Sequence, residues 1–341
     1  MPVSFANAVR WLARALPALV AVPMLLAVTL GFFGDFYPAL DTIGQGRLHL
    51  CVGLLLFAPA LLLRRGSSLA LVCAVVGGLG LYSTLPFLPL GHGTEASVGT
   101  PRYTLLQMNL DIYSTDQDRA LSLIARLRPD IVTAEELSAS WVRGFEKLAG
   151  SYPYRFYCKA PFLRGNGDVA ILSRRPFIEV SAVRPGELTV CDGPNAFGAK
   201  TVDFNGIPVT IGAQHLRWPW PGRQPSMVQG LKTVLPRLRD PLIVAGDFNS
   251  APWSASVRAL AQASGTRIVG GIGPTWIKRG LPPELGRWIG LPIDNMLVSE
   301  SVDVLKVERP EAVDSDHLPV LLTFTLRFAT SKEPDVRSAE R

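Results

Sequence analysis

The sequence predicts an α/β domain in which two β-sheets pack face to face with helices outside, preceded by an all-α transmembrane anchor. Three observations predict this fold class. Three long apolar runs occupy the first 90 residues, a series of short apolar runs alternates with helical stretches after them, and polar motifs stand where several of these short runs end. Strands that alternate with a few long helices favour two packed sheets covered by helices.

The apolar runs near the amino terminus are long enough for membrane helices. Residues 15–34 contain no charged side chain, and at about 1.5 Å per residue they span roughly 30 Å of hydrocarbon. A shorter run covers residues 48–63, and a third extends from residue 66 beyond Leu88. A buried core helix or a signal peptide is the alternative, but three successive runs with no evident cleavage site favour an anchor. We expect three transmembrane helices in residues 1–90, with lipid contact through residues 10–90.

Basic residues at the ends of these runs predict the topology. Arg10 and Arg14 precede the first run, and Arg64 and Arg65 lie between the second and the third. The positive-inside rule places both positions in the cytoplasm, so three crossings deliver the rest of the chain to the outer side. The second run is short and begins beside Arg47. If this run does not span the membrane, the following domain lies on the other side.

The charge of the chain divides between the anchor and the domain. Five of the 34 basic and two of the 28 acidic residues lie in residues 1–90, so about half of the formal charge of +6 belongs to the anchor. The mildly basic remainder is weak support for extensive nucleic-acid binding, which requires a strong basic stripe. Three local clusters combine Arg or Lys with other basic or aromatic residues, at residues 174–175, 217–223 and 276–288. Each suits phosphate binding or a lipid interface, and a solvated loop is the alternative.

The four cysteines leave the redox chemistry open. Cys51 and Cys73 lie in predicted spans, where a small buried hydrophobe is the default interpretation. Cys158 and Cys191 lie in the domain and could form a disulfide if the domain is exported, but the distance between them is not contained in the sequence.

The pattern beyond the anchor predicts a linker at residues 91–101, one domain at 102–328 and a charged, disordered tail at 329–341. Predicted strands cover residues 103–108, 131–134, 169–172, 200–204, 209–213, 242–245, 295–298 and 320–326, and predicted helices cover 117–127, 227–238 and 255–263.

Polar residues follow the first two predicted strands. Asn109 and Asp111 stand two residues apart and so point to the same side of an extended segment, where a carboxylate and an amide can share one hard cation; a turn would use the same residues. Glu136 follows a strand that should be central, and a carboxylate there is typical of a metal ligand or a base. Glu135 points the other way, where it is solvated or supports the site from behind.

The segment Gly246-Asp247-Phe248-Asn249 follows another apolar strand. Glycine lets the backbone turn, Asp247 and Asn249 project the same way, and Phe248 returns to the core. A carboxylate in this position can orient an attacking water while the amide donates to a phosphoryl oxygen. The alternative is an Asx-turn.

Two of the four histidines lie at the ends of apolar strands. His317 follows Asp316 directly before the last strand, and His215 follows Gln214. Adjacent strand residues face opposite ways, which predicts different jobs for Asp316 and His317. Asp294 is the candidate partner that orients His317 and keeps it protonated.

Taken in order, these motifs make residues 100–328 similar to the endonuclease/exonuclease/phosphatase superfamily. The resemblance implies a four-layer α/β sandwich with the site at one edge of the packed sheets. It also implies a metal site at Asn109, Asp111, Glu136 and Asp316, with Glu136 as the principal Mg²⁺ ligand and Mn²⁺ as the alternative metal.

The same resemblance assigns catalytic roles. His215 would contact phosphate, and Asp247 and Asn249 would position the nucleophilic water and stabilise the transition state. Asp294 and His317 would form a dyad on the phosphate.

Three departures from the family pattern bear on the substrate. Asn295 follows Asp294 where relatives usually carry an aromatic residue or histidine, and Glu135 stands where glutamine is common. Asp168 adds an acid to a region that looks substrate-facing, which disfavours a long polyanion such as DNA. None of these removes a catalytic group.

The resemblance implies a metal-dependent hydrolase of phosphodiesters or phosphomonoesters, acting on nucleic acid, a lipid head group or a small phosphoester. Two alternatives are a sphingomyelinase-like lipid phosphodiesterase and a noncatalytic membrane binding protein on the same fold. With its anchor, the chain resembles bacterial membrane-tethered members, which implies a multi-pass protein of the inner membrane whose domain is periplasmic or extracellular. No obligate protein partner is expected.

Overall fold

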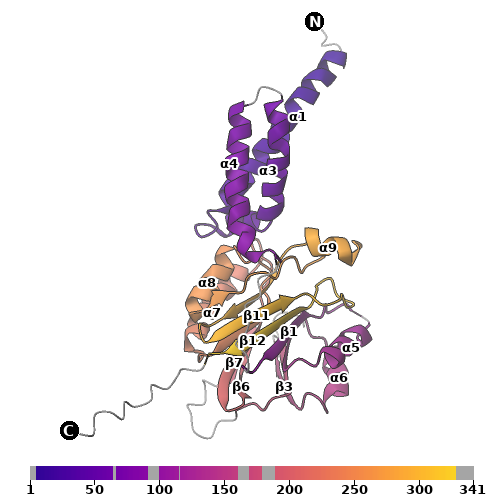
Figure 1. Ribbon diagram of the computed structural model, residues 1–341, viewed down its shortest axis with the longest axis vertical. Coiled ribbons are helices and arrows are strands. Elements are labelled where there is room, and N and C mark those ends of the chain that lie inside the picture. Colours follow the sequence, from indigo (N-terminus) through magenta and orange to yellow (C-terminus); the bar gives the residue numbers. More distant parts are fainter. Residues whose placement is uncertain are drawn as a thin grey trace, which may run out of the picture.

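The computed structural model describes residues 5–63, 67–90, 100–114, 116–159, 169–178 and 189–327. A bundle of helices stands on one end of an α/β domain (Figure 1).

The bundle consists of α1 (Phe5–Gly31), the short α2 (Pro38–Gly44), α3 (Arg47–Leu62) and α4 (Ser67–Thr84). The helices pack through small and apolar side chains that include Ala21, Cys51 and Cys73. Their outer faces are also apolar, since Leu56 is 73% exposed and Leu79 is 63% exposed. A helical bundle that is apolar on both its inner and outer faces is typical of a lipid environment.

Only part of the predicted anchor meets a length and hydropathy criterion for membrane spans. Residues 68–87 are long and apolar enough, and α2 with α3, which are bent by 59°, would make a second span if counted as one. Within the described residues the apolar part of α1, Ala15–Gly31, is shorter than the criterion requires. Three transmembrane helices therefore remain a prediction.

The domain contains two six-stranded mixed sheets. The first has the order β11-β12-β1-β2-β4-β3 and the second the order β5-β6-β7-β8-β10-β9. The strands of the first sheet are β1 (Tyr103–Asn109), β2 (Ile131–Glu135), β3 (Tyr154–Cys158), β4 (Val169–Ser173), β11 (Val302–Glu308) and β12 (Val320–Leu326). Those of the second are β5 (Thr189–Asp192), β6 (Phe197–Phe204), β7 (Ile207–His215), β8 (Leu242–Asp247), β9 (Arg267–Ile268) and β10 (Asp294–Val298). In each sheet one central pair is parallel, β1 with β2 and β7 with β8.

Three apolar cores hold four layers together. The main core lies between the sheets and includes Leu105, Ile211 and Phe324. Helices α5 (Asp118–Leu127) and α6 (Ala139–Phe145) pack on the outer face of the first sheet. Helices α7 (Gln224–Val234) and α8 (Ala255–Ser264) cover the second, and α9 (Pro283–Ile289) lies beside the bundle (Figure 1). The predicted fold class, two packed mixed sheets flanked by helices, is confirmed.

Several elements were not predicted, for physical reasons. Strand β11 is an edge strand with only two buried residues, and β3 and β5 are short edge strands, so none has a long apolar run. The helix predicted over residues 227–238 begins earlier, at Gln224, and gives way at Pro236 to a 3₁₀ turn, Leu235–Arg237, because proline cannot donate to a continuing helix. Other 3₁₀ turns are Leu85–Phe87, Glu146–Leu148 and Gly193–Asn195.

A disulfide joins Cys158 of β3 to Cys191 of β5, with 5.3 Å between the Cα atoms. It links an edge strand of one sheet to an edge strand of the other. Asp168, most of the predicted linker and the predicted tail lie outside the described residues.

Candidate active site

The predicted site residues meet at one edge of the sandwich because the parallel strands end there. Asn109 at the end of β1 lies opposite Glu135 of β2, and His215 at the end of β7 lies opposite Asp247 of β8. Strand β10 runs the other way and begins at the same edge, where Asp294 pairs with Asp247. The two sheets thus bring residues from distant parts of the chain to one place.

Asp247 lies at the centre of this group. Its Oδ1 accepts the backbone N–H of Asn249 at 2.7 Å, and its Oδ2 accepts the side-chain amides of Asn249 and Asn109, both at 3.0 Å. The Nε2 atoms of His215 and His317 lie 3.7 and 3.9 Å from the same Oδ2. Burial raises the pKa of Asp247 to about 8, although the charge of His317 opposes the shift.

Three site residues adopt left-handed backbone conformations just after their strands. The φ angles are 52° at Asp111, 57° at Glu136 and 46° at Asn249. Asp and Asn tolerate this region, whereas for Glu136 it is unusual and stores strain, which is common at functional sites. Gly246 has φ 158°, and a Cβ there would lie 1.9 Å from the carbonyl oxygen of Gln214. These turns follow β1, β2 and β8 at the edge where Asn109, Glu136 and Asp247 meet.

Glu136 lies beside Asp247 and is more open to solvent. Its Oε1 accepts the amide of Asn109 at 3.3 Å and lies 3.6 Å from His215 Nε2, while its Oε2 accepts the backbone N–H of Ile112 at 3.1 Å. Its side chain is 22% exposed. Asn109 therefore bridges the two carboxylates.

His317 and Asp294 form the expected dyad, with His317 Nδ1 2.8 Å from Asp294 Oδ2. Burial lowers the pKa of His317, but the carboxylates of Asp294 and Asp247 outweigh burial and raise the pKa to about 10. The raised pKa favours the protonated ring. Its Nε2 faces the centre of the site, where it can donate to an anionic oxygen.

Gln107, which was not predicted, supports this arrangement from behind. Its side-chain amide donates to Asp294 Oδ1 and to Glu135 Oε2, both at 2.8 Å. Glu135 is fully buried, and burial raises the pKa of its carboxyl well above the usual range. Of the two possibilities that the sequence left open for Glu135, the structure has the buried supporting one. A polar residue in the middle of an apolar strand was the signal for Gln107.

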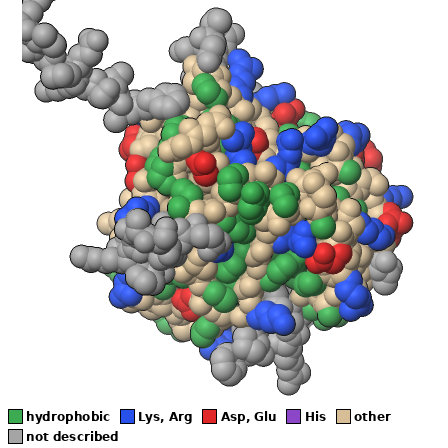
Figure 2. Space-filling view, turned by 90° about the horizontal axis from the view of Figure 1, so that it is seen from below, with side chains coloured by type: hydrophobic (Ala, Val, Ile, Leu, Met, Phe, Trp, Pro, Cys, Tyr) green, Lys and Arg blue, Asp and Glu red, His purple; other side chains and the backbone are tan. Residues whose placement is uncertain are grey.

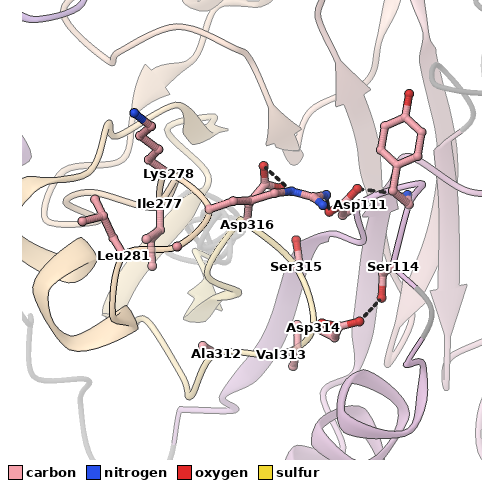
Figure 3. A pocket seen from close by; sticks show the side chains of 13 residues that line it. Asp111, Ser114, Ile277, Lys278, Leu281, Ala312, Val313, Asp314, Ser315 and Asp316 are labelled. Carbon is pink, nitrogen blue, oxygen red and sulfur yellow. Dashed lines mark hydrogen bonds and ion pairs between the residues drawn. The ribbon is translucent and has the colours of Figure 1, made fainter.

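Asp111 and Asp316 lie on an open side of the site with Arg279. The Arg279 guanidinium donates to Asp111, and its Nε lies 3.8 Å from Asp316 Oδ2. Trp276 Nε1 also donates to that Asp316 oxygen, at 3.3 Å. Figure 3 shows Asp111 and Asp316 at the wall of a pocket of about 360 Å³, which Arg279, Ser114 and other residues of 277–281 and 312–316 also line. Arg279 was predicted only as one member of a basic cluster.

Five side chains at the middle of the site, here called the central cluster, offer donor atoms that suit a divalent metal: Glu136, His215, Asp247, Asp294 and His317. One ligand atom from each of Glu136, His215 and Asp247 lies within 4.8 Å of the others, and the same holds for Asp247, Asp294 and His317. In the second group both carboxylate oxygens of Asp294 already form hydrogen bonds, with His317 and Gln107, which favours the first group. Two carboxylates plus water are what Mg²⁺ commonly takes from a protein. Asp111 and Asp316 contact Arg279 here, and their metal role stays a prediction.

Several solved structures are similar to this chain. An endonuclease/exonuclease/phosphatase protein from Beutenbergia cavernae is 20% identical with a TM-score of 0.50, and the match covers 66% of this chain and 72% of that one. The human Nocturnin catalytic domain with bound sulfate is 19% identical with a TM-score of 0.48, over 67% of this chain and 94% of that one. D. rerio TDP2 humanized by 14 mutations is 20% identical with a TM-score of 0.48, and the match covers 66% of this chain and 99% of that one. These likenesses concern the fold alone.

Among curated proteins, none matches the chain significantly. The model of the Endonuclease/Exonuclease/phosphatase family, in contrast, matches residues 106–317, which include every residue of the central cluster. The chain therefore belongs to the endonuclease/exonuclease/phosphatase family.

Proposed function

We propose that this protein is a Mg²⁺-dependent hydrolase of phosphate esters, with Mn²⁺ as the alternative metal, tethered to a membrane. The observation that carries the proposal is the convergence of Glu136, His215 and Asp247 around one point, beside the ring of His317, whose pKa two carboxylates raise. Acidic metal ligands, a water-orienting carboxylate and a cationic donor are the groups that phosphoester hydrolysis requires.

Each side chain has a distinct role in the proposed reaction. Asp247 orients the attacking water and accepts its proton, because its carboxylate is held in place by two amides. His317, oriented by Asp294, donates from Nε2 to a non-bridging phosphoryl oxygen, and Asn249 and His215 bind the same phosphoryl group. A Mg²⁺ held by Glu136 would supply charge that offsets the negative charge of the transition state.

The tether proposal places residues 10–90 in a bilayer and the domain on its outer side. The exposed apolar faces of α3 and α4 support it. The end of α3 and the start of α4 lie at the end of the bundle far from the domain, as the predicted topology requires (Figure 1). The disulfide between Cys158 and Cys191 also supports it, because disulfides persist in oxidising compartments.

The proposal is tested with the full chain purified in detergent. Bis(p-nitrophenyl) phosphate and p-nitrophenyl phosphate report diester and monoester hydrolysis. We expect Mg²⁺-dependent turnover that EDTA abolishes and added Mg²⁺ restores. Binding of phosphoesters without any turnover, under Mg²⁺ or Mn²⁺, would instead favour a noncatalytic binding protein.

A separate experiment tests the topology. A periplasmically active reporter fused to the carboxyl terminus should be active in a bacterial host, and a cytoplasmically active one should not. The opposite pattern would contradict the outward orientation while leaving the hydrolase proposal intact.

A further inference from the structure

Buried polar contacts attach the bundle to the domain. The carboxylate of Asp41 on α2 accepts the backbone N–H groups of Ala255 and Ser256 at 2.7 and 3.2 Å, and the Ser256 hydroxyl at 2.8 Å. Asp41 is only 4% exposed and sits at the amino terminus of α8, where a negative charge is favourable. Trp253 Nε1 donates to the carbonyl of Gly44 at 2.8 Å. Ordered, buried hydrogen bonds of this kind fix an orientation, which a loose linker does not.

The turn after α4 makes a second attachment. The carbonyls of Pro86 and Phe87 accept the backbone N–H groups of Gly271 and Gly273 at 3.2 and 3.1 Å. The Phe87 ring also contacts the Trp253 ring, with 6.2 Å between centroids. Two attachments from different parts of the bundle restrain the domain from swinging about either one.

The attached edge of the domain is the catalytic edge. Gln45 accepts the backbone N–H of Ala251 at 2.5 Å, two residues beyond Asn249. Thr42 donates to the carbonyl of Trp220 at 3.0 Å, in the loop that follows His215. On a third side His49, in the first turn of α3, lies 2.9 Å from the carbonyl of Ile289, at the end of α9. The loops that follow β7 and β8 thus reach the base of the bundle, and so does helix α9, which precedes β10.

Exposed aromatic side chains gather at this level on both parts of the molecule. On the bundle, Phe36 is 83% and Tyr82 is 74% exposed; on the domain, Trp288 is 71% and Trp220 is 47% exposed. Aromatic residues at the ends of membrane helices mark the membrane–water interface. At the opposite end of the domain, Figure 2 shows basic and acidic side chains interspersed with hydrophobic ones.

We infer that the catalytic edge faces the bilayer surface and that the substrate is the phosphoester head group of a bilayer lipid. Trp220 and Trp288 lie in the interface on either side of the site, and Arg279, between Asp111 and Asp316, is placed to meet an anionic head group in the open pocket. This inference rests on the proposed hydrolase function and tether. It adds that the orientation of the domain selects the substrate.

The test compares one lipid and one soluble substrate on the same enzyme. Full-length protein is reconstituted into vesicles of phosphatidylcholine and phosphatidylglycerol with Mg²⁺, and water-soluble phosphorus products are measured beside bis(p-nitrophenyl) phosphate hydrolysis. The wild type should release products from the vesicle lipids. The W220S/W288S double variant should lose at least about tenfold of lipid hydrolysis and keep its soluble turnover, because both side chains are exposed.

The matched control is Tyr154→Ser, an exposed aromatic on the edge strand β3, which should change neither activity. Quenching of tryptophan fluorescence by brominated phosphatidylcholine should fall in the double variant and persist in the control. Soluble turnover without lipid hydrolysis, or lipid hydrolysis equal in wild type and double variant, would overturn the inference alone. Failure to hydrolyse either substrate would overturn the proposed function as well.

Discussion

The two sides of the active site differ in how they are built. On the buried side, Asp247, Asp294 and His317 are each 5% exposed or less, and neighbouring amides or carboxylates hold all three. On the open side, Arg279, whose side chain is 60% exposed and comes from a loop, pairs with the buried Asp111 and with Asp316, whose side chain is 23% exposed. The buried side is rigid before substrate arrives, and the open side can rearrange.

This difference separates chemistry from recognition. Charges shielded from water interact more strongly, and groups already fixed in place need no reorganisation during the reaction. An exposed ion pair contributes little by itself and exchanges readily for another anion. We therefore expect substitutions on the buried side to abolish turnover, and those on the open side to change substrate affinity.

The largest effect is expected on the buried side. Asp247→Ala and His317→Ala should each lower kcat by about 10³-fold or more, since a positioned acid or base contributes about 10² to 10⁴. In the proposed reaction Asp247 contacts the attacking water and His317 contacts the phosphoryl group. Turnover is measured at saturating Mg²⁺, and circular dichroism checks folding. Asp130→Asn is the control, because this partly buried carboxylate is bound to Arg175 just before β2, at the end of that strand away from the site. Undiminished turnover in both alanine variants would refute the assignment.

Glu136→Gln tests whether the partly exposed carboxylate between the two sides holds the metal. Loss of one charged ligand should raise the half-saturating Mg²⁺ concentration by at least about tenfold, with the defect partly overcome at high Mg²⁺. Glu135→Gln makes the same change at the adjacent position, whose side chain points to Gln107, and should leave the Mg²⁺ dependence unchanged. Equal Mg²⁺ dependence of turnover in Glu136→Gln and the wild type would show that Glu136 does not bind the metal.

Arg279→Ala tests the open side. The KM for a phosphodiester should rise about threefold to tenfold with kcat within about twofold, because an exposed charge contributes modestly to binding and the chemistry lies elsewhere. Lys278→Ala changes the neighbouring basic residue of the same pocket and is expected to do less. A fall in kcat as large as that of the buried-side variants would erase the distinction between the two sides.

The same contrast explains what sequence reasoning could reach. Asn109, Glu136, Asp247 and His317 follow strands or precede one, so their convergence follows from strand direction, and the sandwich follows from the alternation of strands and helices. Arg279 belongs to a loop whose position depends on tertiary pairing of Trp276 with His317, which no local pattern encodes.

The docking of the bundle was also beyond sequence reasoning. Helix α2 has only seven residues, too few for a periodic signal, and Asp41 gains its role only through the amino terminus of α8. Charged residues between apolar runs were interpreted for membrane topology, and their contacts with the domain required the three-dimensional structure.

The smallest effect is expected behind the site, at Glu135. The pKa of the Glu135 carboxyl is raised in the folded protein. Such a carboxyl stabilises the fold fully at pH values below its pKa in the unfolded chain, and this stabilisation is lost as the pH rises through its pKa in the folded protein. Glu135→Gln removes this loss and keeps an acceptor for Gln107. It should therefore raise the thermal midpoint of the metal-free protein at pH 8, with a gain in the free energy of unfolding on the order of 1 kcal/mol. The gain should shrink toward pH 5, where the buried carboxyl is protonated.

Glu146→Gln, at a surface carboxylate paired with Arg155, is the control and should show no such pH trend. A lower midpoint for Glu135→Gln at pH 8 would mean that the buried carboxylate is ionised and that Gln107 stabilises its charge. The rigidity of the buried side would then depend on a buried anion, and Glu135 would contribute to the field that keeps His317 protonated.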